Sequence, residues 1–181
     1  EAISMKTGLR LVGALFFLSI TSCAGTSAYM KPSLAQATPA TPPADRALVR
    51  FMRPSGFGFA VNFNILDGER VIGNSVAKSQ FDYLAEPGQH LFVATAENKV
   101  FLEADLEPGR TYHVITRIYP GVLYARVAFL PVTQGSTLWA EALEHEKTLQ
   151  RLEPDREALS KLELENKEEI QGVLSRYRTE W

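Results

Sequence analysis

The chain has 181 residues, of which 45% are hydrophobic and 22% charged, with one cysteine and a formal net charge of -2. This composition is typical of a globular protein, the length suits one domain with attached segments, and a single cysteine excludes an intrachain disulfide. Residues 46–133 carry nine Lys/Arg against eight Asp/Glu, net +1, and residues 134–181 carry seven against eleven, net -4. Neither part has the basic stripe of a nucleic-acid-binding protein, so we expect no nucleic-acid partner.

The first 22 residues have the features of a signal peptide. Met5, Lys6 and Arg10 form a short basic head, and Leu11–Ile20 is an uncharged, largely apolar block. Such a block has the size of a signal-peptide core and is too short to cross a bilayer as a helix. Residues 1–4 precede the expected start at Met5 and are interpreted as non-native. Residues 1–22 are therefore left out of the fold prediction.

Cys23 directly follows Ile20, Thr21 and Ser22. A branched apolar residue, two small residues and a cysteine resemble the bacterial lipobox. The resemblance implies that Cys23 becomes the mature N-terminus and carries diacylglycerol and fatty acids such as palmitate. Two or more such chains anchor a protein stably in a membrane. Ala24 in place of aspartate implies sorting to the inner leaflet of the outer membrane, facing the periplasm, although the inner membrane remains open. The alternative for Cys23 is a lone buried thiol.

Residues 23–45 predict a flexible tether after the lipidated cysteine. The segment is rich in Ala, Thr, Ser and Pro and shows no hydrophobic period, so it lacks the apolar surface that a core requires. Such a tether would let a folded domain stand away from the membrane. Residues 46–133 are expected to form that domain, and residues 134–181 a helical extension.

Alternating apolar and polar residues predict short β-strands in residues 46–133. The expected strands are Ala47–Arg53, Phe59–Leu66, Arg70–Gly73, Phe81–Leu84, His90–Ala96, Lys99–Leu106, Thr111–Tyr119 and Val122–Val132. The expected core face of the second strand holds Phe59, Val61, Phe63 and Ile65. About seven or eight strands without an intervening helix predict a mainly β fold, an antiparallel β-sandwich followed by a C-terminal α-helical extension.

Three dipeptides predict tight turns between these strands. Asp67-Gly68 lies between two apolar runs and predicts a hairpin with a type I′ turn. Pro87-Gly88 and Pro108-Gly109 predict type II turns, in which proline sets φ at the second position and glycine accepts the positive φ of the third. Because type II turns match the twist of a hairpin poorly, we expect at least one of them to connect the two sheets.

The residues of these strands and turns resemble a known group of proteins over residues 47–132. The matching stretches are "ALVRFMRPSGFGFAVNFNILDGERVIG", a short Phe-Asp-Tyr strand, "EPGQH" and "LEPGRTYHV". They are similar to small bacterial lipoproteins defined only as a domain of unknown function, which in turn resemble transthyretin-like and PEGA-type β-sandwich modules. The resemblance implies the sandwich fold and carries no active-site residues, because the group has no established site.

Two amphipathic helices are expected in residues 134–181. Apolar residues at three- and four-residue spacing predict a first helix that begins near Ser136, and Pro154 interrupts this pattern. A second helix is expected to begin at Pro154. The two apolar sides consist of Leu138, Ala142, His145, Leu149 and Leu152, and of Leu159, Leu162, Ile170, Val173, Leu174 and Tyr177. Either these sides pack within the protein or they bind a partner.

The sequence contains no pattern that predicts catalysis. None of the three histidines lies in a metal-binding motif, and nucleophile elbows, phosphate-binding glycine loops and the HExxH motif are absent. We therefore expect no catalytic residue, no cofactor and no metal site. The candidate recognition patch is Arg53 with Phe57, because the glycines of the following loop let Phe57 protrude if Phe59 enters the core.

These features predict a noncatalytic, lipid-anchored lipoprotein of the bacterial cell envelope. Its expected role is structural or protein-interacting, with the membrane and a periplasmic or outer-membrane protein as partners. The alternative is a ligand-binding β-sandwich for a glycan, a peptide or a lipid, and an enzyme is the least favoured class. A pocketless sandwich with an apolar helical surface favours the interaction role, whereas a preformed apolar cavity with a few inward polar groups favours ligand binding.

Overall fold

The computed structural model describes residues 27–34, 41–123 and 125–180, and this part of the chain is mainly β. The expected signal peptide and Cys23 lie outside the described residues. The strands are β1 (Met30–Pro32), β2 (Ala47–Arg53), β3 (Phe63–Asp67), β4 (Arg70–Ser75), β5 (Ser79–Ala85), β6 (Gly88–Thr95), β7 (Lys99–Leu106), β8 (Thr111–Pro120), β9 (Ala125–Val132) and β10 (Gln150–Pro154). The helices are α1 (Thr137–Thr148), α2 (Arg156–Glu165) and α3 (Lys167–Glu180).

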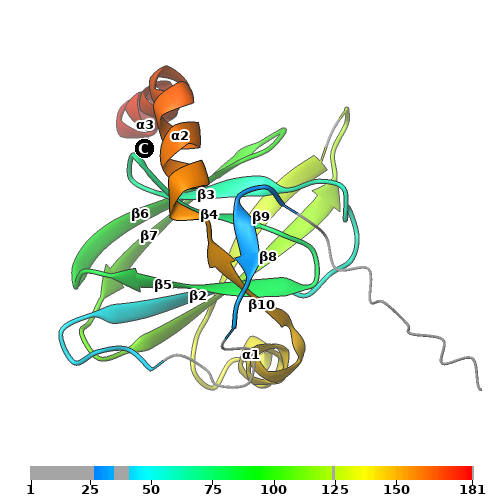
Figure 1. Cartoon of the computed structure of the whole chain (residues 1–181), viewed down its shortest axis with the longest axis vertical. Helices are drawn as coiled ribbons and strands as arrows, with labels where there is room; N and C mark the ends of the chain where they lie inside the picture. Colours follow the sequence, from blue (N-terminus) through cyan, green and yellow to red (C-terminus); the bar gives the residue numbers. More distant parts are fainter. Residues whose placement is uncertain (1–26, 35–40, 124, 181) are drawn as a thin grey trace, which may run out of the picture.

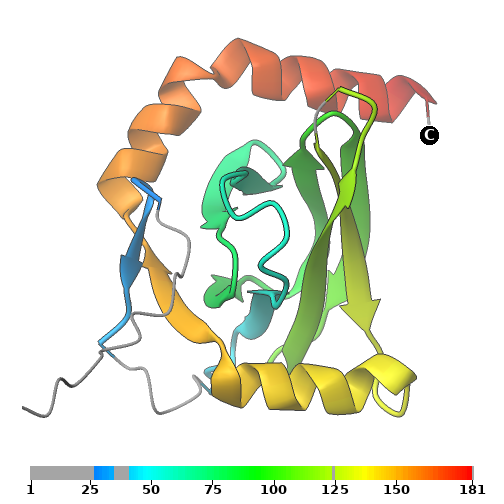
Figure 2. The same ribbon diagram turned by 90° about the vertical axis from the view of Figure 1, so that its right-hand side faces the viewer.

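The strands form two mostly antiparallel sheets. A six-stranded sheet has the order β1-β10-β5-β2-β8-β9, and a four-stranded sheet has the order β4-β3-β6-β7. The pairs β10–β5 and β2–β8 are parallel. Figures 1 and 2 show the layers: α1 lies along the outer side of the six-stranded sheet, and α2 and α3 lie along the outer side of the four-stranded sheet.

The main hydrophobic core lies between the two sheets, and Phe51 of β2 is at its centre. Its ring stacks on Phe81 of β5 at a centroid distance of 5.3 Å and meets Phe92 of β6 edge-on at 5.3 Å. Phe129 of β9 lies 6.1 Å away. These rings come from both sheets, and such aromatic pairs stabilise a core beyond their buried area.

The turns that connect the strands agree with most of the sequence analysis. β3 and β4 form the expected hairpin, but its central residues are Gly68 and Glu69, and only Gly68 has positive φ, which is typical of a type II′ turn instead of type I′. Gly88 and Gly109 have positive φ. The chain passes to the four-stranded sheet at Pro87-Gly88 and returns at Pro108-Gly109, so both turns connect the two sheets.

The strand expected at Phe59–Leu66 is shorter than predicted. β3 begins at Phe63, and Phe63 and Ile65 are buried as expected, whereas Phe59 and Val61 are exposed. The preceding residues form a turn in which the Val61 N–H donates to the Gly58 carbonyl at 2.8 Å, with positive φ at Gly58. In this turn the Val61 N–H is bonded within the loop, and hydrogen bonds to the neighbouring strand begin only at Phe63.

The tether and the helical extension both contain a strand that the sequence analysis did not predict. β1 lies within the segment expected to be a flexible tether, and β10 lies where the first helix was expected to continue to Leu152. The two strands pair antiparallel with Met30 opposite Pro154, and β10 pairs in parallel with β5. Met30 and Leu152 are buried in the main core. Burial of these two side chains in the core outweighs the local patterns, which predicted a flexible tether at Met30 and a helix at Leu152.

The second expected helix is two helices. Asp155 is the N-cap of α2 and accepts a hydrogen bond from the Ala158 N–H, and Asn166 ends α2 before α3 begins. The apolar sides pack within the protein. Leu159, Ile170, Val173 and Leu174 cover the outer face of the four-stranded sheet. In α1, Ala142 packs on the outer face of the six-stranded sheet.

The two sheets approach each other closely at Gly73, and a substitution there tests this packing. A Cβ atom at Gly73 of β4 would lie 2.5 Å from the ring of Phe81, so Gly73→Ala should lower the free energy of unfolding by about 1–3 kcal/mol through overpacking. The matched control is Gly172→Ala in α3, where an added Cβ would meet no atom within 4 Å apart from its chain neighbours and its own helix backbone, and this change should raise stability by up to about 1 kcal/mol. Urea unfolding followed by circular dichroism measures both, and equal effects would contradict the packing.

Candidate functional site

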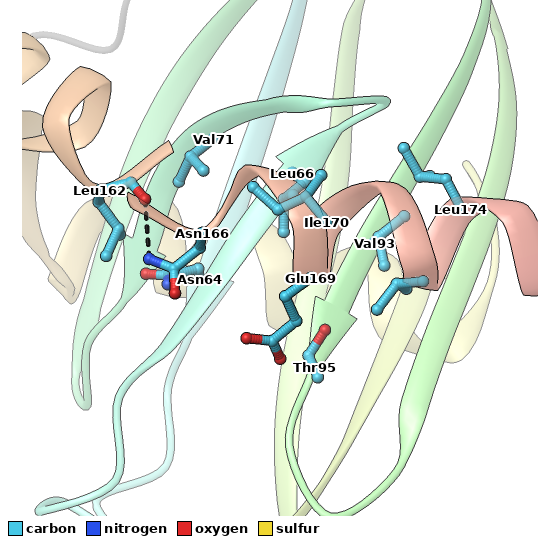
Figure 3. A pocket seen from close by; sticks show the side chains of 11 residues that line it. Asn64, Leu66, Val71, Val93, Thr95, Leu162, Asn166, Glu169, Ile170 and Leu174 are labelled. Carbon is cyan, nitrogen blue, oxygen red and sulfur yellow. Dashed lines mark hydrogen bonds between the residues drawn. The ribbon is translucent and has the colours of Figure 1, made fainter. Parts of the chain in front are cut away.

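The outer face of the four-stranded sheet and the helices above it enclose a hollow of about 190 Å³ (Figure 3). Its floor comes from alternate residues of β3 and β6 and from one residue of β4, and its roof comes from the end of α2 and from α3. The lining residues are Asn64, Leu66, Val71, Val93, Thr95, Leu162, Asn166, Glu169, Ile170, Val173 and Leu174. We call this hollow the helix–sheet pocket.

The lining of the helix–sheet pocket is apolar except for four side chains that gather on one side. In Figure 3, Glu169 lies next to Thr95, and Asn166 lies next to Asn64. Among the described residues Glu169 forms no ion pair, and its carboxylate is exposed at the rim. The pocket therefore combines an apolar interior with a polar edge that carries one negative charge.

Hydrogen bonds hold the polar edge in place. Asn74 Nδ2 donates to Asn64 Oδ1 at 2.9 Å, and Ser27 Oγ donates to Asn74 Oδ1 at 2.8 Å. On the helix side, Asn166 Nδ2 donates to the Leu162 carbonyl at 2.8 Å. The described N-terminal segment thus reaches the pocket through a chain of two hydrogen bonds.

The break between α2 and α3 creates the space above the sheet. Glu163 of α2 accepts a hydrogen bond from the Val71 N–H of the edge strand β4 at 2.9 Å, which fixes α2 to the sheet. Asn166 then ends α2, and α3 continues in a new direction across the sheet (Figure 2). The two helices meet at an angle over a twisted sheet. Their side chains therefore do not fill the space below the break, and this space is the pocket.

A second cluster of polar residues is buried between α1 and the six-stranded sheet. Arg50 of β2 is 1% exposed, and its Nε and Nη2 donate to the two carboxylate oxygens of Asp82 on β5 at 2.6 and 2.9 Å. Its Nη1 also pairs with Glu146 of α1. Arg151 of β10 lies 3.3 Å from Asp82, and His113 of β8 lies 3.1 Å from Glu146. We call these five residues the buried charge network.

Burial and neighbouring charges shift the pKa values of the two arginines in the network. Burial opposes the charge of Arg50, but hydrogen bonds and attraction from Asp82 and Glu146 outweigh it and raise the pKa of Arg50. Burial and the nearby positive charge of Arg50 lower the pKa of Arg151. Because the network joins α1 to β2, β5, β8 and β10, it can hold the helix and the sheet together.

The structure brings the two residues of the candidate recognition patch into contact, but it buries the charged one. Arg53 is 1% exposed, and its guanidinium donates to the carbonyls of Phe57, Gly58, Val61 and Ser75 at 2.6–3.2 Å. Burial lowers the pKa of Arg53 to about 10, which leaves it charged at neutral pH. Arg53 therefore organises the loop after β2 and is not exposed to a carboxylate or phosphate. Phe57 protrudes, but Phe59, which was expected to enter the core, is exposed as well.

The three histidines have partners within the protein. His90 contacts Asp67 Oδ2 through Nδ1 at 2.7 Å and the Glu86 carbonyl through Nε2 at 2.8 Å, so both ring nitrogens are occupied. His145 contacts Glu141 on the same helix at 3.1 Å. Within the described ranges, no group of three or more His, Cys, Asp or Glu side chains is arranged to hold a metal ion.

No protein-family model, no curated protein and no solved structure matches the chain. The resemblance to lipoproteins of a domain-of-unknown-function group therefore stays a prediction. Of the helices that the structure describes, none has the length and hydropathy of a membrane span.

Sequence reasoning did not find the helix–sheet pocket or the buried charge network. The pocket depends on the break at Asn166, which the periodicity of the apolar side does not reveal. One signal was present for the network: Arg50 interrupts an apolar run in β2 that is buried throughout. A buried arginine requires hydrogen-bond acceptors, which can be carboxylates or backbone carbonyls, but the sequence does not show which residues supply them.

Removal of Arg50 should be costly because it leaves Asp82 and Glu146 without their main positive partner. We expect Arg50→Ala to lower the free energy of unfolding by about 3–5 kcal/mol. The control is Arg110→Ala, whose pair with Glu107 is largely exposed, and a change within about 0.5 kcal/mol is expected there. Thermal and urea unfolding measure both variants. Similar losses for the two would show that the network is not a buried ion cluster.

Proposed function

We propose that the protein is a noncatalytic, lipid-anchored lipoprotein of the bacterial cell envelope, in which a β-sandwich formed by the two sheets binds a small amphiphile in the helix–sheet pocket. The anchor is an acylated Cys23 in the inner leaflet of the outer membrane, with the folded domain in the periplasm. The observation that carries the binding activity is the pocket itself, with its apolar interior and polar edge.

Ligand binding is favoured over a structural or protein-interacting role. The interaction role assigned partner contacts to the loops or to the apolar helix faces, and the helix faces pack on the two sheets. The remaining discriminating feature is a preformed apolar cavity with a few polar groups, and the helix–sheet pocket has this form. A periplasmic or outer-membrane protein partner remains the second candidate, without a surface on these helices to support it.

The size of the pocket limits the ligand to one small apolar group. At about 190 Å³ it is somewhat larger than a cavity of about 150 Å³ that binds one benzene ring, and smaller than the roughly 300–1,000 Å³ of drug-sized sites. One phenyl ring or a short alkyl chain fits this space. A whole diacyl lipid or an oligosaccharide does not.

The polar edge indicates the head group of the ligand. The exposed carboxylate of Glu169 repels an anion and attracts a cation, and the side chains of Asn64 and Thr95 can exchange hydrogen bonds with an amine or a hydroxyl. We therefore infer an amphiphile with an amine or alcohol head, whose apolar end contacts Val93, Ile170 and neighbouring residues.

A pair of single-charge variants tests the pocket. Hexylamine should shift the methyl NMR signals of Val93, Ile170 and Leu174, and hexanoate should bind more weakly. Glu169→Gln should weaken hexylamine binding about fivefold, because an exposed ion pair contributes up to roughly 1 kcal/mol. Glu168→Gln changes the same charge on a neighbouring residue that does not line the pocket and should leave binding unchanged. Equal effects of the two variants, or shifts outside the pocket, would contradict the site.

The membrane anchor is tested separately at Cys23. Cys23→Ser removes the sulfur that is expected to carry diacylglycerol, so the protein should leave the membrane fraction or accumulate with an uncleaved leader. Cell fractionation and intact mass measurement show this outcome. Because this change leaves every described residue of the pocket lining in place, hexylamine binding should persist in the released variant. Unchanged membrane association would contradict acylation.

A further inference from the structure

Two loops expose large apolar side chains at one end of the molecule. In the loop between β2 and β3, Phe57, Phe59 and Val61 are 54%, 68% and 36% exposed, and at the β8–β9 turn Val122 and Leu123 are 90% and 82% exposed. We call these five residues the apolar end. Figure 2 views this side, with the cyan loop in front and the yellow-green tip of the β8–β9 hairpin beside it.

Interactions within the protein hold both loops in place. Arg53 donates to the carbonyls of Phe57 and Gly58, and Gly58 packs against Ile118 near the end of β8. At the other loop, the carboxylate of Glu97 accepts hydrogen bonds from the N–H groups of Val122 and Leu123, both at 3.0 Å. The exposed side chains therefore stand on backbone that is already ordered.

The chain enters the folded domain at the same end. Ser27 is bonded to Asn74 near the end of β4, and the carbonyl of the next residue, Ser75, accepts a hydrogen bond from Arg53. Cys23 precedes Ser27 by four residues, so their Cα atoms are at most about 14 Å apart. An acyl anchor on Cys23 would hold this end of the domain close to the bilayer.

The charges around the apolar end are mostly positive. Lys78 lies along the loop at Gly56, Lys99 lies opposite Thr95 in the β6–β7 hairpin, and Arg126 lies opposite Tyr119 next to the β8–β9 turn. Glu97 is the acidic residue among the described residues of the β6–β7 and β8–β9 turns. Its carboxylate faces the N–H groups of Val122 and Leu123. Exposed apolar side chains with basic neighbours are typical of surfaces that bind anionic phospholipid.

We propose that the apolar end inserts into the phospholipid interface of the membrane that holds the Cys23 anchor. The proposal rests on the acylation of Cys23 in the proposed function and goes beyond it, because it gives the folded domain one orientation at the membrane. Phe57, Phe59, Val122 and Leu123 enter the head-group region, and the basic side chains contact lipid phosphates. The domain thus rests on the bilayer instead of standing away from it.

Site-directed spin labelling tests this orientation. Acylated protein is purified from bacterial membranes and reconstituted in vesicles of phosphatidylethanolamine and phosphatidylglycerol. Nitroxides are attached to Phe59→Cys, Leu123→Cys and the control Leu164→Cys. Leu164 is 75% exposed on α2 and lies beside Glu69, at the opposite end of the β3–β4 hairpin. Because an acylated Cys23 has no free thiol, the introduced cysteine is the single labelling site.

The readout is the ratio of accessibility to oxygen, which concentrates in lipid, over accessibility to a water-soluble nickel chelate. We expect this ratio to be about fivefold or more higher at positions 59 and 123 than at position 164, since an interfacial segment enters the bilayer by about 5–10 Å. Equal ratios at the three positions in acylated protein would overturn the orientation and leave the proposed function intact.

Two other outcomes also decide the proposal. Mass measurement that finds a free Cys23 thiol contradicts the anchor and the orientation together. Dipolar broadening at position 59 that disappears on dilution with unlabelled protein would assign the apolar end to a second copy of the chain, and this result also overturns the proposal.

Discussion

The charge of Arg50 constrains how the elements around the six-stranded sheet are arranged. A guanidinium that is removed from water needs hydrogen-bond acceptors, and those of Arg50 include carboxylates from β5 and from α1. Such a network contributes little net stability compared with apolar residues of the same size, but its disruption is costly. Its effect is therefore on arrangement: α1 must place Glu146 above Arg50, and β10 must place Arg151 beside Asp82.

A second buried arginine holds the loop at the end of the same strand. Arg53 is the last residue of β2, and it directs four backbone carbonyls toward its guanidinium. Three of these carbonyls belong to the loop after β2, and the fourth belongs to Ser75 at the end of β4, so Arg53 fixes the loop to the neighbouring strand. Arg50 thus fixes the position of α1, and Arg53 fixes the backbone of the loop after β2. Neither arginine is free to bind a ligand.

Local sequence signals were sufficient where neighbours in the chain determine the structure. The bounds of β2 and β7 were predicted correctly, and glycines at turns correctly located the passages between the sheets. The prediction failed where partners lie far apart. Phe59 alternated like a strand residue but is held in a turn by Arg53, and Leu152 continued a helical stripe but is buried as part of β10. The polar edge of the pocket combines Asn64 and Asn166, which no local pattern connects.

The strand order also determines when the fold can be completed. β10 lies between β1 and β5, so Met30 pairs with Pro154, and the six-stranded sheet remains incomplete until the last third of the chain is present. Contacts between such distant residues close large loops and slow folding. A nascent chain that ends before residue 150 leaves both neighbours of β10 as open strand edges.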